Sequence, residues 1–171
     1  MTQSIDSFAE LASSYCFLIE QHGEHSTEEF ITRVREILPL LYYHALRLPD
    51  IESTDEQSDR EISHDEWSEI FTSLQRKLGI NDHYWEIYDP LKTDHDDAVA
   101  ASLSDDLADI WRDLKTGISH WKVCSDTMRK QIVWDWHFSF HYHWSDHAVD
   151  ALRAVNWIAE HYGVRESEKD A

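Results

Sequence analysis

Residues 134–144 read Trp134-Asp135-Trp136-His137-Phe138-Ser139-Phe140-His141-Tyr142-His143-Trp144, and this stretch has the strongest influence on how the chain can fold. Six of its eleven residues are aromatic, three are histidine, and none breaks a helix. Aromatic side chains bury large apolar areas when a protein folds. We therefore expect this segment to lie at the centre of the core.

The aromatic residues of the stretch occupy every second position, an alternation typical of a half-buried strand. In a helix the same residues form two stripes on roughly opposite sides (134, 138, 142 and 136, 140, 144), and a helix that is apolar nearly all round is a buried one. A strand needs a partner, and no second segment of comparable β character stands nearby. The flanking sequence is helical, so we predict a buried helix over about 126–144.

The composition favours a helical protein. At 171 residues the chain is long enough for one domain with a sizeable core, and 42% of its residues are hydrophobic. Only four glycines and three prolines interrupt it, which suits long helices and suits a β-sandwich poorly. We predict an all-α, single-domain bundle of five or six helices around the buried aromatic-rich helix.

Apolar residues recur at three- and four-residue steps in further segments, which predict helices over about 4–21, 27–48, 64–78, 94–115 and 146–162. The break at Ser145-Asp146 leaves open whether residues 126–162 form one kinked helix or two. Ser26 and Ser63 each stand three residues before a glutamate, a capping-box pattern. Between the helices we expect an acidic mobile loop over 50–61 and an irregular connector over 84–90, and after them a frayed charged tail over 164–171.

The formal charge of -19 restricts the partners. Such a surface repels phosphate groups, so we expect neither nucleic acid nor an anionic membrane to bind. A well-solvated acidic surface explains the charge; a divalent-metal site, a basic protein partner and mimicry of a nucleic acid are the alternatives. No signal peptide opens the sequence and no run reaches membrane-spanning length, which favours a cytoplasmic location.

Two histidine pairs could bind a metal ion from one face of a helix. His137 with His141, and His143 with His147, are each four residues apart, and Asp150 extends the second pair by one turn. The alternative interpretation is that these histidines fill space and donate hydrogen bonds among the aromatic residues. A di-iron bundle needs two Glu-x-x-His pairs, and this sequence has only the one that ends at His64.

Aspartate pairs offer a second kind of metal site. Asp106 and Asp109 lie one turn apart on one predicted helix, and Asp146 and Asp150 on another. Magnesium prefers such oxygen ligands. All-α nucleotide pyrophosphohydrolases, which carry Glu-x-x-Glu and Glu-x-x-Asp pairs, show a loose resemblance, with aspartate here in place of glutamate. The helical periodicity points Asp109 away from the apolar face, so a solvated acidic face is the alternative.

Three segments resemble a family of small bacterial proteins that carries only a domain-of-unknown-function label. They are Tyr84-Trp85-Glu86-Ile87-Tyr88-Asp89-Pro90, Leu103-Ser104-Asp105-Asp106-Leu107-Ala108-Asp109-Ile110-Trp111-Arg112-Asp113-Leu114-Lys115 and His143-Trp144-Ser145-Asp146-His147-Ala148-Val149-Asp150-Ala151-Leu152-Arg153. The resemblance covers most of the chain and implies an all-helical fold. It supplies no activity, substrate or catalytic residue.

The sequence contains no Gly-x-Ser-x-Gly elbow, phosphate loop or dinucleotide fingerprint. The leading hypothesis is therefore a cytoplasmic binding or regulatory module that works through protein contacts. Whether the protein is also an enzyme stays open, with the balance against it, and its oligomeric state is open too. The second is a divalent-metal-dependent hydrolase of a phosphorylated small molecule, with a possible divalent ion as its one cofactor. The third is an acidic mimic of a nucleic acid. The candidate metal ligands are His143, His147, Asp150, Asp106 and Asp109.

Overall fold

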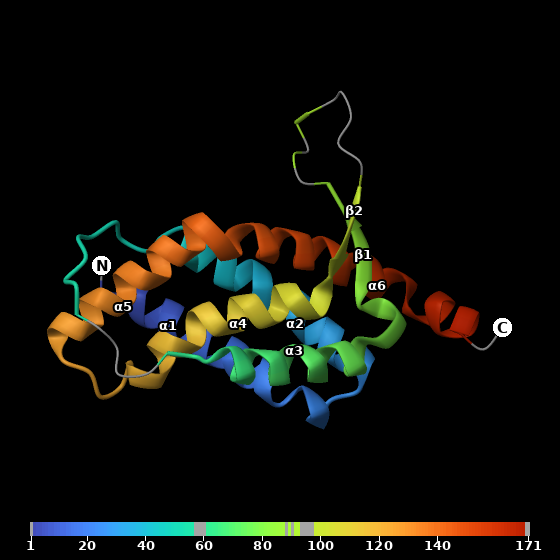
Figure 1. Ribbon diagram of the computed structural model, residues 1–171, viewed down its shortest axis with the longest axis horizontal. Coiled ribbons are helices and arrows are strands. Elements are labelled where there is room, and N and C mark those ends of the chain that lie inside the picture. The colour runs from blue at the N-terminus through green and yellow to red at the C-terminus, as the bar shows by residue number, and fades with distance from the viewer. Residues whose placement is uncertain (1, 57–60, 88, 90, 93–97, 170–171) are drawn as a thin grey trace.

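Six helices and a small hairpin make up the described chain. This computed structural model describes residues 2–56, 61–87, 89, 91–92 and 98–169, with side chains from residue 4 to residue 161. The helices and strands are α1 (Thr2–Glu20), α2 (Thr27–Ala45), α3 (His64–Leu78), β1 (His83–Glu86), β2 (Val99–Ser102), α4 (Leu103–His120), α5 (Asp126–Ser139) and α6 (Ser145–Lys169) (Figure 1). The predicted helical bundle is confirmed. No described helix is long and apolar enough to cross a membrane.

Serine side chains begin several of these helices, as the sequence predicts at two of them. The hydroxyl oxygens of Ser26 and Ser63 accept hydrogen bonds from the backbone three residues on, and at Ser63 the side chain of Glu66 completes a capping box. Ser102 and Ser125 begin α4 and α5 in the same way. Each such bond satisfies a backbone N–H that the first turn would otherwise leave without a partner.

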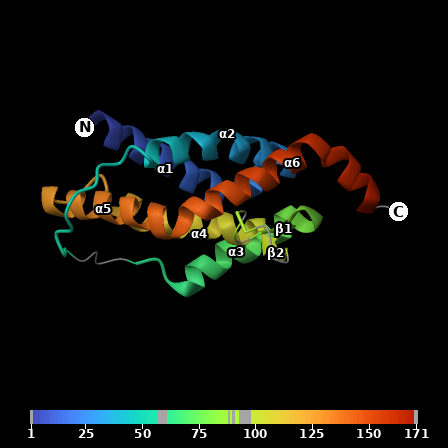
Figure 2. The same ribbon diagram turned by 90° about the horizontal axis from the view of Figure 1, so that it is seen from above.

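Helix α4 lies at the centre of the bundle. It packs against α1, α3, α5 and α6. Seen from above, α1 and α2 lie on one side of the layer that holds α4, α5 and α6, and α3 lies on the other (Figure 2). Because neighbouring helices cover α4 on several sides, little of its surface is left for solvent, and Asp106 and Asp109 are buried along with its apolar residues.

The aromatic stretch is helical but buried on one side only. Trp136, Phe140 and Trp144 have almost no exposed surface, whereas Phe138 is 46% and Tyr142 is 76% exposed. The prediction of burial nearly all round is thus corrected to one buried stripe and one exposed stripe, because only α4 and its neighbours cover this helix.

Residues 126–169 run as one continuous helical segment. Residues 140–144 form a π-helical turn, in which the N–H of Ser145 reaches the carbonyl of Phe140, and α6 follows directly. The chain therefore does not break at Ser145-Asp146. A π turn inside an α-helix is rare and is frequently found at functional sites.

A close contact joins α5 to α4. A Cβ atom added at Gly117 would lie 2.6 Å from Trp136 Nε1 and 2.7 Å from Ile132 Cγ2. Only glycine leaves room for the indole at this point. The Trp136 ring N–H donates a hydrogen bond to the carbonyl of Leu114, one turn earlier on α4.

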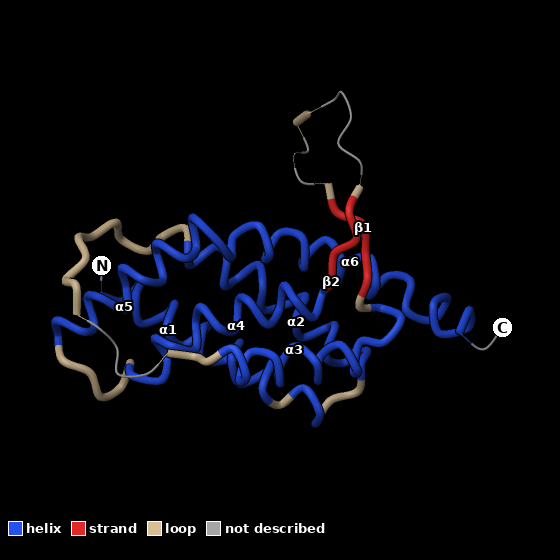
Figure 3. Tube along the Cα trace, viewed as in Figure 1, coloured by secondary structure: helices blue, strands red, loops and turns tan. Residues whose placement is uncertain are grey.

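The hairpin corrects two sequence predictions. Residues 83–86, expected within or beside an irregular connector, pair antiparallel with residues 99–102, which were expected to be helical (Figure 3). The backbone of Ser102 is extended, as a helix-capping residue requires, so α4 can begin only at Leu103. The buried Asp82 ties the hairpin to α4, since its carboxylate accepts a hydrogen bond from the backbone N–H of Ser104. Residues 88, 90 and 93–97 lie outside the described residues.

The acidic loop and the tail are described in part. Residues 51–56 have no regular secondary structure, and Ser53 and Thr54 both donate hydrogen bonds to the buried side-chain carbonyl of Gln131. Residues 57–60, within the same predicted loop, lie outside the described residues. Helix α6 continues through the predicted tail to Lys169, and residues 170–171 lie outside the described residues. The mobility of the loop stays a prediction.

Candidate metal centre

Helix α4 places three aspartates on one face. Asp106, Asp109 and Asp113 follow at steps of three and four residues, which bring side chains to the same side of a helix. Opposite them, the π turn contributes His143 and the first turn of α6 contributes His147. The two histidines are four residues apart, and their ring centroids are 5.0 Å apart.

Each histidine is held by a different aspartate through the same ring nitrogen. His147 Nδ1 lies 2.8 Å from Asp106 Oδ1, and His143 Nδ1 lies 2.7 Å from Asp113 Oδ2. A neutral histidine that donates from Nδ1 to a carboxylate keeps its Nε2 lone pair free to bind a metal ion. The two outer aspartates therefore select the tautomer that a metal ligand needs.

The middle aspartate faces both remaining ring nitrogens. Asp109 Oδ2 lies 3.6 Å from His147 Nε2 and 3.7 Å from His143 Nε2. Ligand atoms of these three residues all lie within 4.8 Å of one another. Two ligand atoms that each bind an ion at about 2.1 Å with a tetrahedral angle are about 3.4 Å apart. The spacing and the nitrogen and oxygen donors therefore fit one small divalent ion.

Arg112 pairs with the other oxygen of the middle aspartate. Its guanidinium nitrogen lies 2.9 Å from Asp109 Oδ1 as an ion pair, but the contact lacks hydrogen-bond geometry. This buried oxygen accepts no hydrogen bond from the residues that the structure describes. The same guanidinium lies 5.7 Å from the centroid of the Trp67 ring. Arg112 thus balances the charge of Asp109 while leaving Oδ2 directed at the histidines.

The carboxylates and rings of the site alter one another's protonation. Hydrogen bonds to Asp113 and Asp106 raise the pKa of His143 and of His147 above the ordinary histidine value, although partial burial opposes this. Burial raises the pKa of Asp106 to about 6, against the hydrogen bonds from His147 and Tyr84. Without a metal ion, protons therefore occupy the histidines up to a higher pH than on an exposed helix.

The hairpin reaches the centre through one tyrosine. The Tyr84 hydroxyl donates a hydrogen bond of 2.5 Å to Asp106 Oδ2, while the other oxygen of Asp106 holds His147. Burial and the nearby Asp106 charge raise the pKa of Tyr84, so the hydroxyl stays protonated and remains a donor. Strand β1 thus fixes the orientation of a carboxylate that in turn orients a histidine.

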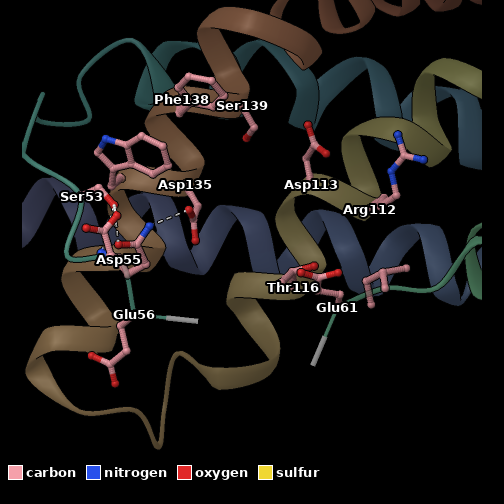
Figure 4. A pocket seen from close by; sticks show the side chains of 13 residues that line it. Ser53, Asp55, Glu56, Glu61, Arg112, Asp113, Thr116, Asp135, Phe138 and Ser139 are labelled. Atoms are coloured by element: carbon pink, nitrogen blue, oxygen red, sulfur yellow. Dashed lines mark hydrogen bonds between the residues drawn. The ribbon is translucent and has the colours of Figure 1, made fainter. Parts of the chain in front are cut away.

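A pocket of about 720 Å³ adjoins the centre. Arg112 and Asp113 of α4 line one side of it, and Phe138 and Ser139 of α5 line another (Figure 4). Since Asp113 also holds His143, this pocket borders the group of histidines and aspartates. Five carboxylates and one guanidinium are among its lining groups, so its interior favours cations (Asp55, Glu56, Glu61, Asp113, Asp135 and Arg112).

Comparison with known proteins places the chain in a family. A family described as a domain of unknown function, DUF5063, matches residues 1–161. The chain belongs to this family. The crystal structure of protein BF1032 from Bacteroides fragilis is similar over 90% of each chain, with a TM-score of 0.78 and 23% sequence identity. A likeness at that identity shows the fold alone. No curated protein shows significant similarity to the chain.

In this DUF5063 protein the predicted site residues are only partly brought together. His143, His147, Asp106 and Asp109 meet as described, although Asp109 was predicted to face away from the core. Asp150 contributes no atom to the converging group; burial and the nearby Glu86 and Asp146 charges raise its pKa. The solvated acidic face expected around Asp106 and Asp109 is wrong, because side chains of the π turn, α6 and β1 cover it.

Sequence reasoning missed two members of the centre. Asp113 stands four residues after Asp109, and its spacing alone could have placed it on the same face. Tyr84 gave no such signal, since the hairpin that carries it to Asp106 was not predicted. His137 and His141, the other predicted pair, pack ring against ring at 4.6 Å and have no aspartate or glutamate partner among the described residues.

Proposed function

We propose that this protein binds one divalent transition-metal ion through Asp109, His143 and His147, and that the centre supports a hydrolytic reaction. One observation carries the proposal: two Nε2 atoms and a carboxylate oxygen converge, and a separate aspartate holds the Nδ1 atom of each ring. Such second carboxylates are typical partners of metal-binding histidines. Histidines that merely fill space have no need of this double support.

The donor set indicates the class of chemistry. An ion with three protein ligands leaves a coordination position for water or substrate, which is the arrangement of hydrolytic zinc centres. Two histidines and one carboxylate can also hold iron(II). Asp109, His143 and His147 would bind the ion. Asp106 and Asp113 would orient the two rings, and Arg112 would lie beside the site. The adjoining pocket gives a substrate room to approach from the α5 side.

The substrate class suggested by the sequence gains little support. A phosphorylated small molecule would meet five carboxylates in the adjoining pocket against the single charge of Arg112. Like charges in a confined site repel. A neutral or cationic substrate therefore suits this pocket better, and hydrolysis of a phosphorylated compound stays a prediction.

Elemental analysis of untagged protein purified without chelator tests the proposal. We expect about one zinc, iron, manganese or nickel ion per chain, and we expect Asp109→Asn to lose it. Asp150→Asn is the matched control, because this carboxylate lies on the same helix as His147 but outside the converging group. A metal-free protein that also fails to take up any of these ions on titration would exclude the centre.

A binding module is the second candidate, and an apolar groove favours it. Side chains of α2 and α6 line a groove of about 370 Å³. Tyr43, Leu46 and Val149 in it are each more than half exposed. Exposed apolar patches often mark protein contacts. Leu46→Lys should abolish a specific partner's binding in co-purification, and Val123→Lys, at an exposed apolar position outside the groove, should not. The nucleic-acid mimic stays a prediction.

A further inference from the structure

A second cavity lies between the hairpin and α6, apart from the pocket that adjoins the metal centre. It has a volume of about 510 Å³, and Asn81, Tyr84, Trp85, Arg153 and Trp157 are among the residues that line it. Cavities of about 300–1,000 Å³ are the usual size for small-molecule sites. It shares Tyr84 with the centre and none of the three proposed metal ligands.

Asn81 is a buried residue with unsatisfied polar groups. Its side chain is 2% exposed, and neither its amide nitrogen nor its amide oxygen has a hydrogen-bond partner in the part of the chain that the structure describes. Buried polar groups are nearly always paired, and leaving one unpaired costs about 1–3 kcal/mol. An amide that lacks both partners and lines a cavity is therefore suited to a ligand that supplies them.

The backbone around this amide is firmly held. Asn81 ends a short 3-10 turn (Gly79–Asn81), and the next residue, Asp82, is fully buried. The backbone carbonyl of Asp82 accepts a hydrogen bond of 2.8 Å from the N–H of Leu103, and its carboxylate accepts one from Ser104. The amide of Asn81 is thus presented from a fixed position at the start of α4.

Two indole rings stand at the sides of the cavity. Trp85 is 68% and Trp157 is 53% exposed, which is unusual for such large apolar side chains. The Trp157 ring stacks on His161 with ring centroids 4.0 Å apart, and this contact holds the indole in place. Flat heteroaromatic rings bind by stacking on aromatic side chains of this kind.

We propose that this cavity binds a neutral, flat heteroaromatic ring that presents a hydrogen-bond donor beside an acceptor, as the edge of a nucleobase or nucleoside does. Asn81 pairs with that edge through its own adjacent acceptor and donor, and Trp85 stacks on the ring. The amide atoms are closed to water in the free protein, so side chains around the cavity must shift as the ligand enters. Arg153 supplies further donors at the rim.

The acidity of the surroundings favours a neutral ligand over a nucleotide. Burial raises the pKa of Asp150, and the nearby Glu86 charge raises it further, so two carboxylates lie close together beside the hairpin. A phosphate on the ligand would be repelled by these charges, and Arg153, which lines the cavity, already acts on Asp150, whose pKa its charge lowers. The inference stands without the metal centre, since none of the ligands proposed for the ion lines this cavity.

The inference is tested by titrating chelator-treated protein with adenosine, cytidine, guanosine and uridine. Calorimetry and tryptophan fluorescence measure the binding. We expect at least one nucleoside to bind and to change the fluorescence. Trp85→Ala, at an exposed position, should weaken that binding about tenfold or more, because stacking is lost. Tyr142→Ala is the matched control, since this aromatic residue is also more than two-thirds exposed but lies outside the cavity.

Asn81→Leu separates recognition from folding. It replaces the amide by an apolar group of similar size, so binding should be lost while the melting temperature stays the same or rises. If adenosine is the ligand, purine riboside, which lacks the amino donor, should bind at least about tenfold more weakly. If no nucleoside binds, or if neither Trp85→Ala nor Asn81→Leu alters the binding, the inference is overturned. Nucleoside binding that persists after the metal is removed supports the inference, whether or not the protein binds a metal ion at the proposed centre.

Discussion

Two histidine pairs on one helical segment have the same spacing and different surroundings. His137 and His141 lie on the outer part of α5 and the π turn, where their rings contact each other. His143 and His147 lie against α4, where Asp113 and Asp106 hold one nitrogen of each ring and Asp109 faces the others. The same four-residue step therefore yields a surface pair in one place and a candidate metal centre in the other.

The difference shows that histidine spacing supplies only half of such a site. The i, i+4 step brings two nitrogens within reach of one ion. The third ligand and both supporting carboxylates come from a helix about thirty or forty residues away in sequence. Which pair becomes a site is decided by which side of the segment packs on α4.

The largest contrast is expected from removing one histidine of each pair. His147→Ala should abolish binding of the metal ion, because it deletes one of three ligands. His141→Ala should leave the ion in place, because His141 has no aspartate partner in the described part of the chain and lies outside the converging group. The metal content after dialysis and the dissociation constant for zinc are measured for both variants. Equal losses from the two variants would show that the ion binds elsewhere.

The second-largest effect is expected in the pH dependence of metal affinity, which should reflect the titration of His143 and His147. Metal binding needs neutral histidine, so protons compete with the ion. Because the pKa of His143 and of His147 is raised, affinity should keep increasing as the pH rises above 6.5, and should fall by up to about 100-fold per unit below it if both rings titrate. Zinc titrations between pH 5.5 and 8.5 give this profile. An affinity that is flat across this range would contradict the assignment of both histidines.

The supporting aspartates should have a smaller effect. Asp113→Asn keeps the shape of the side chain but removes the charge that favours the Nε2-binding tautomer of His143. We expect zinc affinity to fall by about 10- to 100-fold, as for other supporting carboxylates. The midpoint of the pH profile should also move to lower pH, because the pKa of His143 loses its main cause of elevation. Asp146→Asn, at an exposed carboxylate near the site, should change neither quantity.

A substitution that disturbs the packing of α5 on α4 should have the smallest effect on metal binding, but it should measurably lower the stability of the fold. Gly117→Ala forces a Cβ against Trp136, so the free energy of unfolding should fall by about 1–3 kcal/mol. Urea denaturation measures this. Gly23→Ala is the control, since nothing lies within 4 Å of a Cβ there. Unchanged stability in Gly117→Ala would mean that α5 can move off α4 without cost, and that the contact does not orient the histidine pairs.

Local features of the fold were accessible from the sequence. Ser26 and Ser63 cap helices where the sequence predicts them, since a cap depends on residues within one turn. The hairpin was missed because its strands of four residues pair across a connection of twelve residues, Ile87 to Ala98. Nothing in either strand alone distinguishes it from a loop or a helix start.

The residue pairs of the candidate site could be predicted from the sequence, but the way in which separate helices bring them together could not. The histidine step and the Asp106–Asp109 step are periodic within single helices. Asp109 was misplaced because its burial depends on how the π turn and α6 pack on α4, which periodicity within α4 does not report. Asp150 follows the histidines at helical spacing, yet the converging atoms include the aspartate across the interface and not the one along the helix.

The π turn has a consequence for how such a site could arise or be lost. A π turn holds one residue more than the α-helical turn it replaces, and each residue of an α-helix advances the side chains by about 100°. If residues 140–144 formed a regular α-helix with no residue removed, everything that follows would rotate by about that angle relative to α5. His147 would leave Asp106, and the apolar stripe of α6 would leave α2. The extra residue held in the π turn thus keeps the two halves of this long helix facing their separate partners.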